Sequence, residues 1–469
     1  MAELLDAMHL EAIAYCHWKS NWRLDEWLTG KGDLDLLVAR EDAPRFESLI
    51  YGLGFKRTTV SGGKELPGVV NYYGYRRGCD RLVHIHAHYS LVAGHDASKN
   101  YRFPIESKIL ARVEYDERGI YRISREEELL LFVIRMVLKL SFADGIKRLI
   151  KRTSKQHHEA IRKEIEVLQS GIDTDRFDAV LDDLFPGMGQ TLFKECLDVL
   201  MNKRSAVQCF AAKQRLESYL KPMARHSRLY DHWRRITVIS EAAMQAAGLK
   251  ARTRKRFSNG GAFVAFVGGD GSGKSSCVDA VSSWLGAKFD VRQIHMGRPP
   301  RSPLTYAAAG AAKGWRTLFR GDGAGNILEQ FRSLCIARDR YRLYRRMRKF
   351  ASNGGLVISD RFPLPVIKLM DAPRIKAQPE GAFSTIAARM ARREAEYYRA
   401  MLPPDLLIVL RISPVLAVRR KPTEPASHVH SRSSELWNIA WGDDVTVVDA
   451  NRKFASVLET TRSLIWNRL

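Results

Sequence analysis

A glycine-rich stretch that follows an apolar run constrains this chain more than any other feature. Residues 268–275 read Gly-Gly-Asp-Gly-Ser-Gly-Lys-Ser, which matches G-x-x-x-x-G-K-[ST], and the apolar residues 263–267 precede them. In such a sequence a buried strand is followed by a tight glycine-rich loop and then by a helix. The backbone N–H groups of the loop point at a phosphate. It predicts a phosphate-binding loop (P-loop) on a parallel sheet covered by helices.

The same loop predicts the contacts of a nucleoside triphosphate. Lys274 is expected to reach the β- and γ-phosphates, and Ser275 is expected to hold Mg²⁺. ATP and Mg²⁺ are therefore the implied cofactors. The residues expected to bind the nucleotide are Gly268, Asp270, Gly271, Ser272, Gly273, Lys274, Ser275 and Ser276.

A second apolar run, residues 354–359, ends at Asp360 and is followed by Arg361. Ligands bind at the carboxyl ends of the strands in open parallel sheets. We therefore expect Asp360 to reach the Mg²⁺ ion and Arg361 to face a phosphate. The alternative is a surface ion pair between the two.

The length of 469 residues and the changes of pattern predict three domains. Residues 1–120 mix strand-like and helical stretches, and residues 121–249 read as all-helical, starting at a capping box of Ser124 and Glu127. Residues 250–469 alternate strands with helices. The expected fold class is α/β, with an α+β N-terminal domain and a helical middle.

The net charge indicates which class of partner the chain binds, and the cysteine content indicates its compartment. The chain carries 76 Lys and Arg against 52 Asp and Glu, a net charge of +24, which predicts anionic partners. Residues 298–349 hold 13 of the basic and 3 of the acidic residues. Nucleotide phosphates are the favoured partners, and nucleic acid or an acidic membrane surface is the alternative. Six scattered cysteines, no signal-like start and no membrane-length apolar stretch favour the cytoplasm.

Further motifs in residues 260–469 resemble the thymidylate kinases, and more broadly the P-loop nucleoside and nucleotide kinases. They are the loop itself, Ala-Arg-Asp-Arg at 337–340, Ile-Ser-Asp-Arg-Phe at 358–362, and the run 404–414 followed by a basic triplet at 419–421. The resemblance implies that Arg340, Arg361 and Phe362 contact the acceptor. It also implies a basic lid over the donor phosphates, with Arg419, Arg420 and Arg432 as candidates.

This resemblance implies phosphoryl transfer by positioning and charge neutralisation, with Lys274, Asp360, Arg361, Arg419 and Arg420 as catalytic residues. The segment that usually reads Thr-Arg-Glu-Pro-Gly-Gly-Thr is replaced by residues 295–300, His-Met-Gly-Arg-Pro-Pro, which makes Arg298 a substrate-binding candidate. The expected acceptor is a small phosphorylated molecule. A nucleoside monophosphate is favoured, and a phosphorylated sugar is the alternative.

Two carboxylates, Asp33 and Asp35, lie two residues apart in a predicted strand, so both side chains point to one face, where they could share a divalent metal. Residues 10–115 resemble the nucleotidyltransferase fold, most closely an uncharacterised bacterial family. That resemblance implies a third carboxylate on a later strand, where this sequence has His84 and His86, with Asp80 just before them. Two acids and a histidine suit a Mn²⁺-like ion better than Mg²⁺.

Alternatives remain open for this N-terminal site. Asp33 and Asp35 could cap a turn. His84, His86, His88 and His95 lack a recognisable ligand spacing, so surface or core positions are favoured for them over metal ligation. For the whole chain, the favoured function is ATP-dependent transfer of the γ-phosphate. The alternatives are a nucleotidyltransferase whose P-loop domain supplies or senses nucleotide, and an ATP-binding regulator of nucleic acid or membrane. A second copy, in a homodimer, is a further candidate partner.

Overall fold

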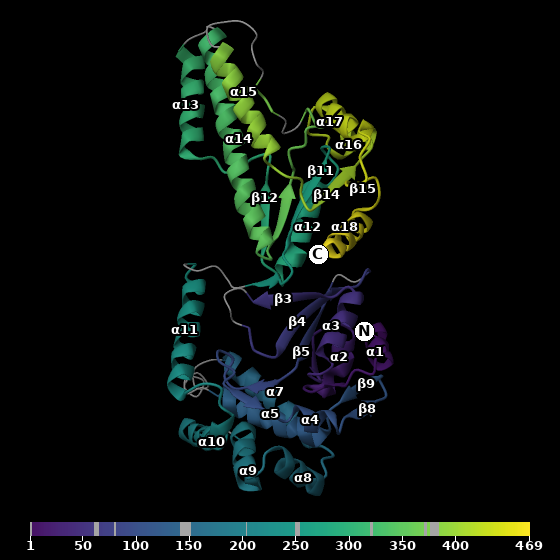
Figure 1. The fold of residues 1–469 in the computed structure, drawn as a ribbon, viewed down its shortest axis with the longest axis vertical. Coiled ribbons are helices and arrows are strands. Elements are labelled where there is room, and N and C mark those ends of the chain that lie inside the picture. The colour runs from purple at the N-terminus through teal and green to yellow at the C-terminus, as the bar shows by residue number, and fades with distance from the viewer. Residues whose placement is uncertain are drawn as a thin grey trace. The chain divides into compact units, whose positions relative to one another are not determined.

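The chain divides into two compact units, shown in the computed structural model of Figure 1. The first comprises Met1–Arg57, Gly62–Arg76 and Arg81–Arg252, and the second comprises Thr58–Ser61, Arg77–Asp80 and Thr253–Leu469. The structure describes residues 2–60, 65–78, 81–140, 152–202, 204–248, 254–318, 322–369, 373–375 and 384–469. The three-domain division at residues 120 and 249 stays a prediction.

The first unit contains a mixed sheet with the strand order β4-β5-β2-β1-β9-β8. Strand β2 (Asp33–Val38) runs parallel to β5 (Leu82–His88) and antiparallel to β1 (Tyr15–His17), and β5 runs antiparallel to β4 (Val69–Tyr75). The central position of β2 and β5 is what brings their polar side chains together. The other strands are β6 (Leu91–Ala93), β7 (Tyr101–Phe103), β8 (Glu114–Asp116) and β9 (Ile120–Arg122), and β3 (Lys56–Val60) begins in this unit and ends in the second.

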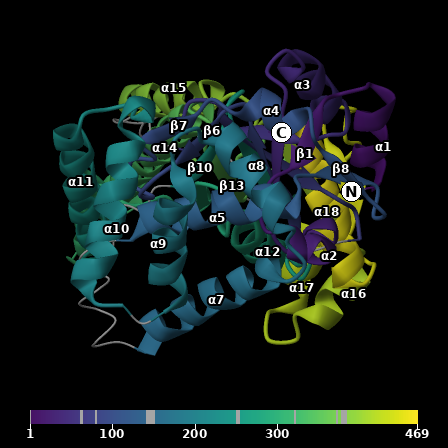
Figure 2. The same ribbon diagram turned by 90° about the horizontal axis from the view of Figure 1, so that it is seen from below.

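Helix α5 (Arg125–Lys139) organises the helical part of the first unit. It begins where predicted, because the Ser124 hydroxyl accepts from the backbone N–H of Glu127 while the Glu127 carboxylate accepts from the N–H of Ser124. Helices α7, α8, α9 and α10 pack against it, as Figure 2 shows from below. The helices of this unit are α1 (Ala2–Leu10), α2 (Leu24–Leu28), α3 (Ala43–Gly52), α4 (Glu106–Leu110), α5, α7 (Arg152–Gln169), α8 (Thr174–Leu184), α9 (Gly189–Met201), α10 (Ala206–Tyr219) and α11 (Arg228–Ala246).

The first unit contains two hydrophobic clusters: one includes Leu34 and Leu36 of β2 with Met8 and Phe46 of α1 and α3, and the other joins the sheet to the helical part. Trp18 and Leu37, at the sheet, are buried in the same cluster as Leu130 and Val133 of α5. Asn21, just after β1, donates its backbone N–H and its side-chain amide to the carboxylate of Glu128, both over 2.8 Å. Burying this apolar surface together stabilises the strands and helices as one body.

The second unit is built on a parallel sheet with the order β12-β13-β11-β14-β15. All residues of the central strand β11 (Ala262–Gly268) are buried, as expected for a strand covered on both faces. The expected α/β fold class is confirmed. The other strands are β10 (Lys255–Phe257), which pairs antiparallel with the end of β3, β12 (Val291–His295), β13 (Leu356–Asp360), β14 (Leu406–Arg411) and β15 (Thr446–Asp449).

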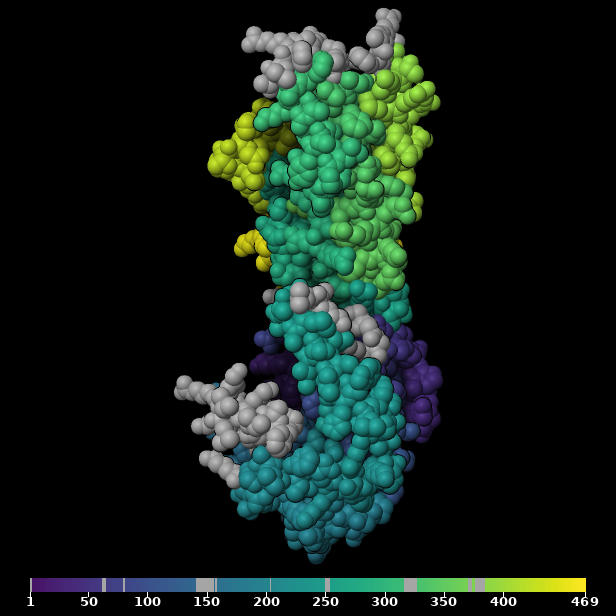
Figure 3. All heavy atoms as spheres, turned by 90° about the vertical axis from the view of Figure 1, so that its left-hand side faces the viewer, coloured from purple at the N-terminus to yellow at the C-terminus, as the bar shows by residue number. Residues whose placement is uncertain are grey.

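Helices cover this sheet. Phe263 and Val267 of β11 are buried in one cluster with Leu343 and Met347 of the long helix α14 (Asp322–Ser352). In Figure 3 the green spheres of α13 and α14 form one continuous face. Among the described residues, no helix is both long and apolar enough to cross a membrane. The remaining helices are α12 (Lys274–Gly286), α13 (Pro303–Leu318), α15 (Ser384–Arg399), α16 (Pro414–Arg420), α17 (Ala426–Asn438) and α18 (Phe454–Arg468).

Candidate functional site

The glycine-rich loop joins the carboxyl end of β11 to the N-terminus of α12. Gly271 and Gly273 adopt left-handed backbone angles, with φ of +80° and +84°, which residues with a Cβ rarely adopt. A Cβ on Gly271 would lie 2.9 Å from the carbonyl oxygen of Ala417 in α16, and one on Gly269 would lie 2.5 Å from the hydroxyl of Ser433 in α17. The glycines therefore allow α16 and α17 to pack directly on the loop.

Lys274, the loop lysine, is buried at the start of α12. Its ammonium donates to the carbonyl oxygen of Gly269 over 3.0 Å. Burial lowers the pKa of Lys274 to about 8, Asp360 acts in the opposite direction, and the nearby charge of Arg361 lowers it further. An anionic ligand would stabilise the protonated form of this buried lysine.

Ser275 and Asp360, the two residues that the sequence predicts to hold Mg²⁺, contact each other. The register of the parallel pair β11 and β13 places Asp360 opposite Phe266, next to the loop. The hydroxyl of Ser275 donates to Oδ2 of Asp360 over 2.9 Å, while Oδ1 of Asp360 is buried and has no hydrogen-bond partner among the residues that the structure describes. A hydroxyl and a carboxylate oxygen that lacks a partner are the hard ligands that Mg²⁺ prefers, so these residues fit the ion.

Arg361 leaves β13 in a strained conformation. Its φ is +70°, in the left-handed region that non-glycine residues rarely occupy. Its backbone N–H donates to the carbonyl oxygen of Phe266 over 2.9 Å, and the hydroxyl of Ser359 donates to its carbonyl oxygen over 2.7 Å. These bonds hold the turn that brings Arg361 close enough to influence Lys274.

Two other cations stand near the loop. Arg432 of α17 bonds Asp270 over 2.9 Å, and although burial alone would raise the pKa of Asp270, this bond lowers it. Lys421, just after α16, contributes to the lowered pKa of Lys274. The sequence analysis did not select Lys421 as a site residue, although it directly follows two selected arginines, Arg419 and Arg420. Arg419 is exposed, and Arg420 donates to the carbonyl oxygen of Ala450 over 3.0 Å.

The acceptor-side candidates occupy three different settings. Arg340 is buried in α14, where Nε donates to the carbonyl oxygen of Met296 over 2.8 Å and Nη1 donates to the hydroxyl of Tyr398. Phe362 is buried in the core beside β11. Arg298, after β12, is exposed.

In the first unit, Asp33 and Asp35 share one face of β2, opposite His84 and His86 of β5. A hydrogen bond from His84 is the largest cause that lowers the pKa of Asp33, to about 2. Burial would raise the pKa of Asp35, but the charge of Lys19 and hydrogen bonds from His86 and His88 hold it well below its usual value. The structure thus gathers the histidines around the carboxylates, and Asp80 lies outside the described residues.

The parallel sheet, the loop and the Ser275–Asp360 contact together define the second unit as P-loop kinase-like, of the nucleotide-binding class. The chain is 25% identical over 218 residues to a protein of Escherichia coli strain K12 described as the uncharacterised ATP-binding protein YghR, and equally to its counterpart in E. coli O6:H1. Each match covers 43% of this chain and 86% of the relative.

Among solved structures, deoxyadenosine kinase from M. mycoides with bound dATP matches 44% of this chain and 98% of its own, with 15% identity and a TM-score of 0.26. No family model matches the chain.

Proposed function

We propose that the second unit transfers the γ-phosphate of ATP to a small phosphorylated acceptor, with a nucleoside monophosphate as the leading candidate and chemistry of the thymidylate-kinase type. The observation that carries this proposal is the contact of Ser275 with Asp360 beside the buried Lys274. Asp360 ends β13, and Lys274 and Ser275 begin α12 after the loop that follows the adjacent parallel strand β11, so all three lie at the carboxyl edge of the sheet, where ligands bind in this class of sheet. The similarity to a protein described as ATP-binding supports the donor.

Ser275 and Asp360 would hold the magnesium ion of Mg·ATP. The ion, when bound, neutralises charge on the β- and γ-phosphates. Asp360 is suited to this role because its Oδ1 is buried and has no partner within the described part of the chain, a state that costs free energy until a ligand satisfies it. Lys274 would exchange its bond with the Gly269 carbonyl for phosphate oxygens.

Cations around the loop would stabilise the charge of the transferring phosphoryl group. Arg361 lies in the strained turn after β13, Arg432 lies in α17 and contacts Asp270 of the loop, and Lys421 lies just before α17. Phosphoryl transfer depends mainly on such positioning and electrostatic stabilisation, which need no covalent step by the protein. Asp270 would release Arg432 to the phosphates as ATP binds.

An anionic acceptor is supported by the basic residues between β12 and β13. Arg298 is open to solvent at the end of β12, and Arg340 lies buried against Tyr398. A phosphate on the acceptor would add a charge-assisted hydrogen bond to these arginines, of which Arg340 already bonds Met296 and Tyr398. A nucleoside monophosphate and a phosphorylated sugar both carry that group, and the two are distinguished by assay.

The test is ADP formation by the full chain with Mg·ATP and a panel of nucleoside monophosphates, sugar phosphates and unphosphorylated nucleosides. We expect ADP formation to depend on a phosphorylated acceptor and to fall at least about 100-fold in Lys274→Ala, which removes a cation from the transition state. Lys288→Ala, which removes an exposed lysine beyond α12, is the matched control and keeps wild-type activity. Equal activity of Lys274→Ala and wild type would refute the assignment.

A second candidate function, nucleotidyl transfer in the first unit, is favoured by the pair of carboxylates on one face of β2. It predicts pyrophosphate release and incorporation of the α-phosphate of ATP into an acceptor. ATP binding without turnover on any acceptor would instead favour a regulatory role.

A further inference from the structure

Five side chains with metal-binding chemistry share one face of the sheet in the first unit. Asp33 and Asp35 alternate along β2, and His84, His86 and His88 alternate along the parallel neighbour β5. The register pairs Asp33 with His84 and Asp35 with His86. Because successive side chains of a strand point to opposite faces, this alternation places all five on the same side.

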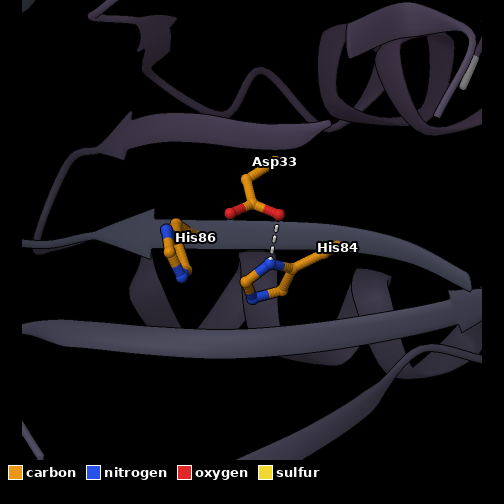
Figure 4. A group of neighbouring side chains, drawn as sticks. All are labelled: Asp33, His84 and His86. Atoms are coloured by element: carbon orange, nitrogen blue, oxygen red, sulfur yellow. Dashed lines mark hydrogen bonds and ion pairs between the residues drawn. The ribbon is translucent and has the colours of Figure 1, made fainter. Parts of the chain in front are cut away.

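Three of these residues form a compact group of ligand atoms. Asp33, His84 and His86 each offer one atom, and the three atoms lie within 4.8 Å of one another. Figure 4 shows the Asp33 carboxylate facing the two imidazole rings. The Asp33 side chain is 46% exposed, so a solvent molecule or a substrate oxygen can reach the group.

Each imidazole is oriented by an oxygen of a residue outside this group, Asn71 for His84 and Asp35 for His86. For His84, Nδ1 faces Oδ1 of Asp33 at 2.7 Å and Nε2 faces the amide oxygen of Asn71 at 3.0 Å. The ring of Tyr73 stacks on His84 with a centroid distance of 4.2 Å. For His86, Nδ1 faces Oδ1 of Asp35 at 3.1 Å. Histidine ligands in metal sites are oriented by such outer oxygens, which fix the tautomer.

Asp35 has a different environment from Asp33. Its Oδ1 accepts from the ammonium of Lys19 over 2.8 Å and also contacts the rings of His86 and His88. The Asp35 side chain is only 11% exposed. A lysine cation bound to this oxygen competes with a metal cation for the same place. Asp35 is therefore suited to orient His86, whereas Asp33 is suited to ligate.

We propose that the first unit binds one divalent transition-metal ion of the zinc or manganese class through Asp33, His84 and His86, with Asp35 and Asn71 as positioning residues. Two imidazoles and one carboxylate suit such ions, whereas Mg²⁺ prefers oxygen ligands alone. Three protein ligands leave a position for water or a substrate oxygen, as in metal sites that perform chemistry. This assignment differs from a magnesium site shared by Asp33 and Asp35.

The test is metal binding by the metal-free full chain in the absence of nucleotide, so that the P-loop contributes no Mg·ATP. Titration calorimetry with Zn²⁺, Mn²⁺ and Mg²⁺, each alone, gives stoichiometry and affinity, and Co²⁺ gives a visible absorption spectrum that reports nitrogen ligands. We expect one Zn²⁺ and one Co²⁺ per chain, with Mg²⁺ binding at least about 100-fold more weakly.

Matched variants locate the site. His86→Gln and Asp33→Asn, which preserve size, are expected to abolish the stoichiometric binding, and Asp35→Asn is expected to weaken it by about 10- to 100-fold, the effect of losing an outer oxygen. The double variant His428→Ala/His430→Ala removes the exposed H-x-H pair of α17 and keeps binding intact. Thermal melts of the variants without metal confirm folding.

Two results would overturn the proposal. One is the absence of stoichiometric Zn²⁺ and Co²⁺ binding by the wild-type chain. The other is binding that survives unchanged in both His86→Gln and Asp33→Asn.

Discussion

The hydroxyl of Ser275 donates to Oδ2 of Asp360 across 2.9 Å, and this contact joins the first turn of α12 to the carboxyl end of β13. The two residues are 85 positions apart in the chain, and the parallel register of β11 with β13 brings them together. The contact occupies the place where Mg·ATP is proposed to bind, so it is the natural starting point for experiments.

Loss of either partner of this contact is expected to remove the magnesium dependence of ATP binding. Ser275→Ala and Asp360→Asn each delete one proposed ligand, and kcat is expected to fall by about 100- to 1,000-fold, the scale of losing one electrostatic stabiliser. Calorimetric titration of ATP with and without Mg²⁺ measures the effect. Ser283→Ala, an exposed serine of the same helix, serves as the control. Unchanged magnesium dependence in both variants would remove these residues from the metal site.

Proton uptake is expected when ATP binds above pH 8. Burial lowers the pKa of Lys274 to about 8, so a growing fraction of the apo protein holds this lysine neutral as the pH rises beyond that value. Phosphate oxygens favour the protonated form, so binding at pH 8.5 takes up a proton, whereas binding at pH 6.5 takes up none. Calorimetry in two buffers of different ionisation enthalpy measures the uptake. Lys274→Arg stays charged and is expected to show no uptake from this position.

Replacing Lys274 with methionine is expected to stabilise the apo protein. Because its pKa falls from 10.5 to about 8 on folding, the protonated lysine destabilises the folded state by up to about 3 kcal/mol below pH 8. The wild type regains this stability as the pH rises from 8 to 10.5. In this range the folded chain has lost the proton of Lys274, whereas the unfolded chain still binds it. Denaturant unfolding at pH 7 should therefore show Lys274→Met more stable than wild type, with a difference that shrinks toward pH 10.5. A variant less stable at both pH values would contradict this account.

Arg432 is expected to matter more for catalysis than Arg420. Arg432 contacts Asp270 of the loop over 2.9 Å, whereas Arg420 donates to the backbone of Ala450. Arg432→Ala should lower kcat by about 10- to 100-fold, with a few-fold effect at most for Arg420→Ala. Steady-state kinetics of both variants with the same acceptor decide between them, and equal losses would show that α16 and α17 contribute alike.

The local sequence alone was sufficient to predict the helices and strands that have a strong sequence motif. The loop at 268–275 predicted a strand followed by a helix, and β11 and α12 lie there. The capping box at Ser124 predicted the start of α5. Both features depend on interactions between residues close in the chain, so a single sequence contains them.

Local patterns do not specify most contacts between distant segments, although the resemblance to the nucleotidyltransferase fold did place His84 and His86 on the strand expected to carry a third ligand. Arg432 reaches Asp270 from 162 residues away, because α17 packs on the loop through Ser433 and Gly269. The alternating histidines of β5 were visible, but their position beside Asp33 depends on the pairing of β5 with β2. Such pairings follow from tertiary packing, which the local pattern does not specify.

The central claim is tested most directly by ³¹P NMR of the full chain with Mg·ATP and a nucleoside monophosphate as acceptor. The account predicts that ATP signals decline while ADP and the β-phosphate doublet of the new nucleoside diphosphate grow in equal amounts, and that Lys274→Ala suppresses all of these changes. Pyrophosphate in place of ADP, or ADP and inorganic phosphate in equal amounts with no phosphorylated acceptor across nucleoside monophosphates and sugar phosphates alike, would contradict it.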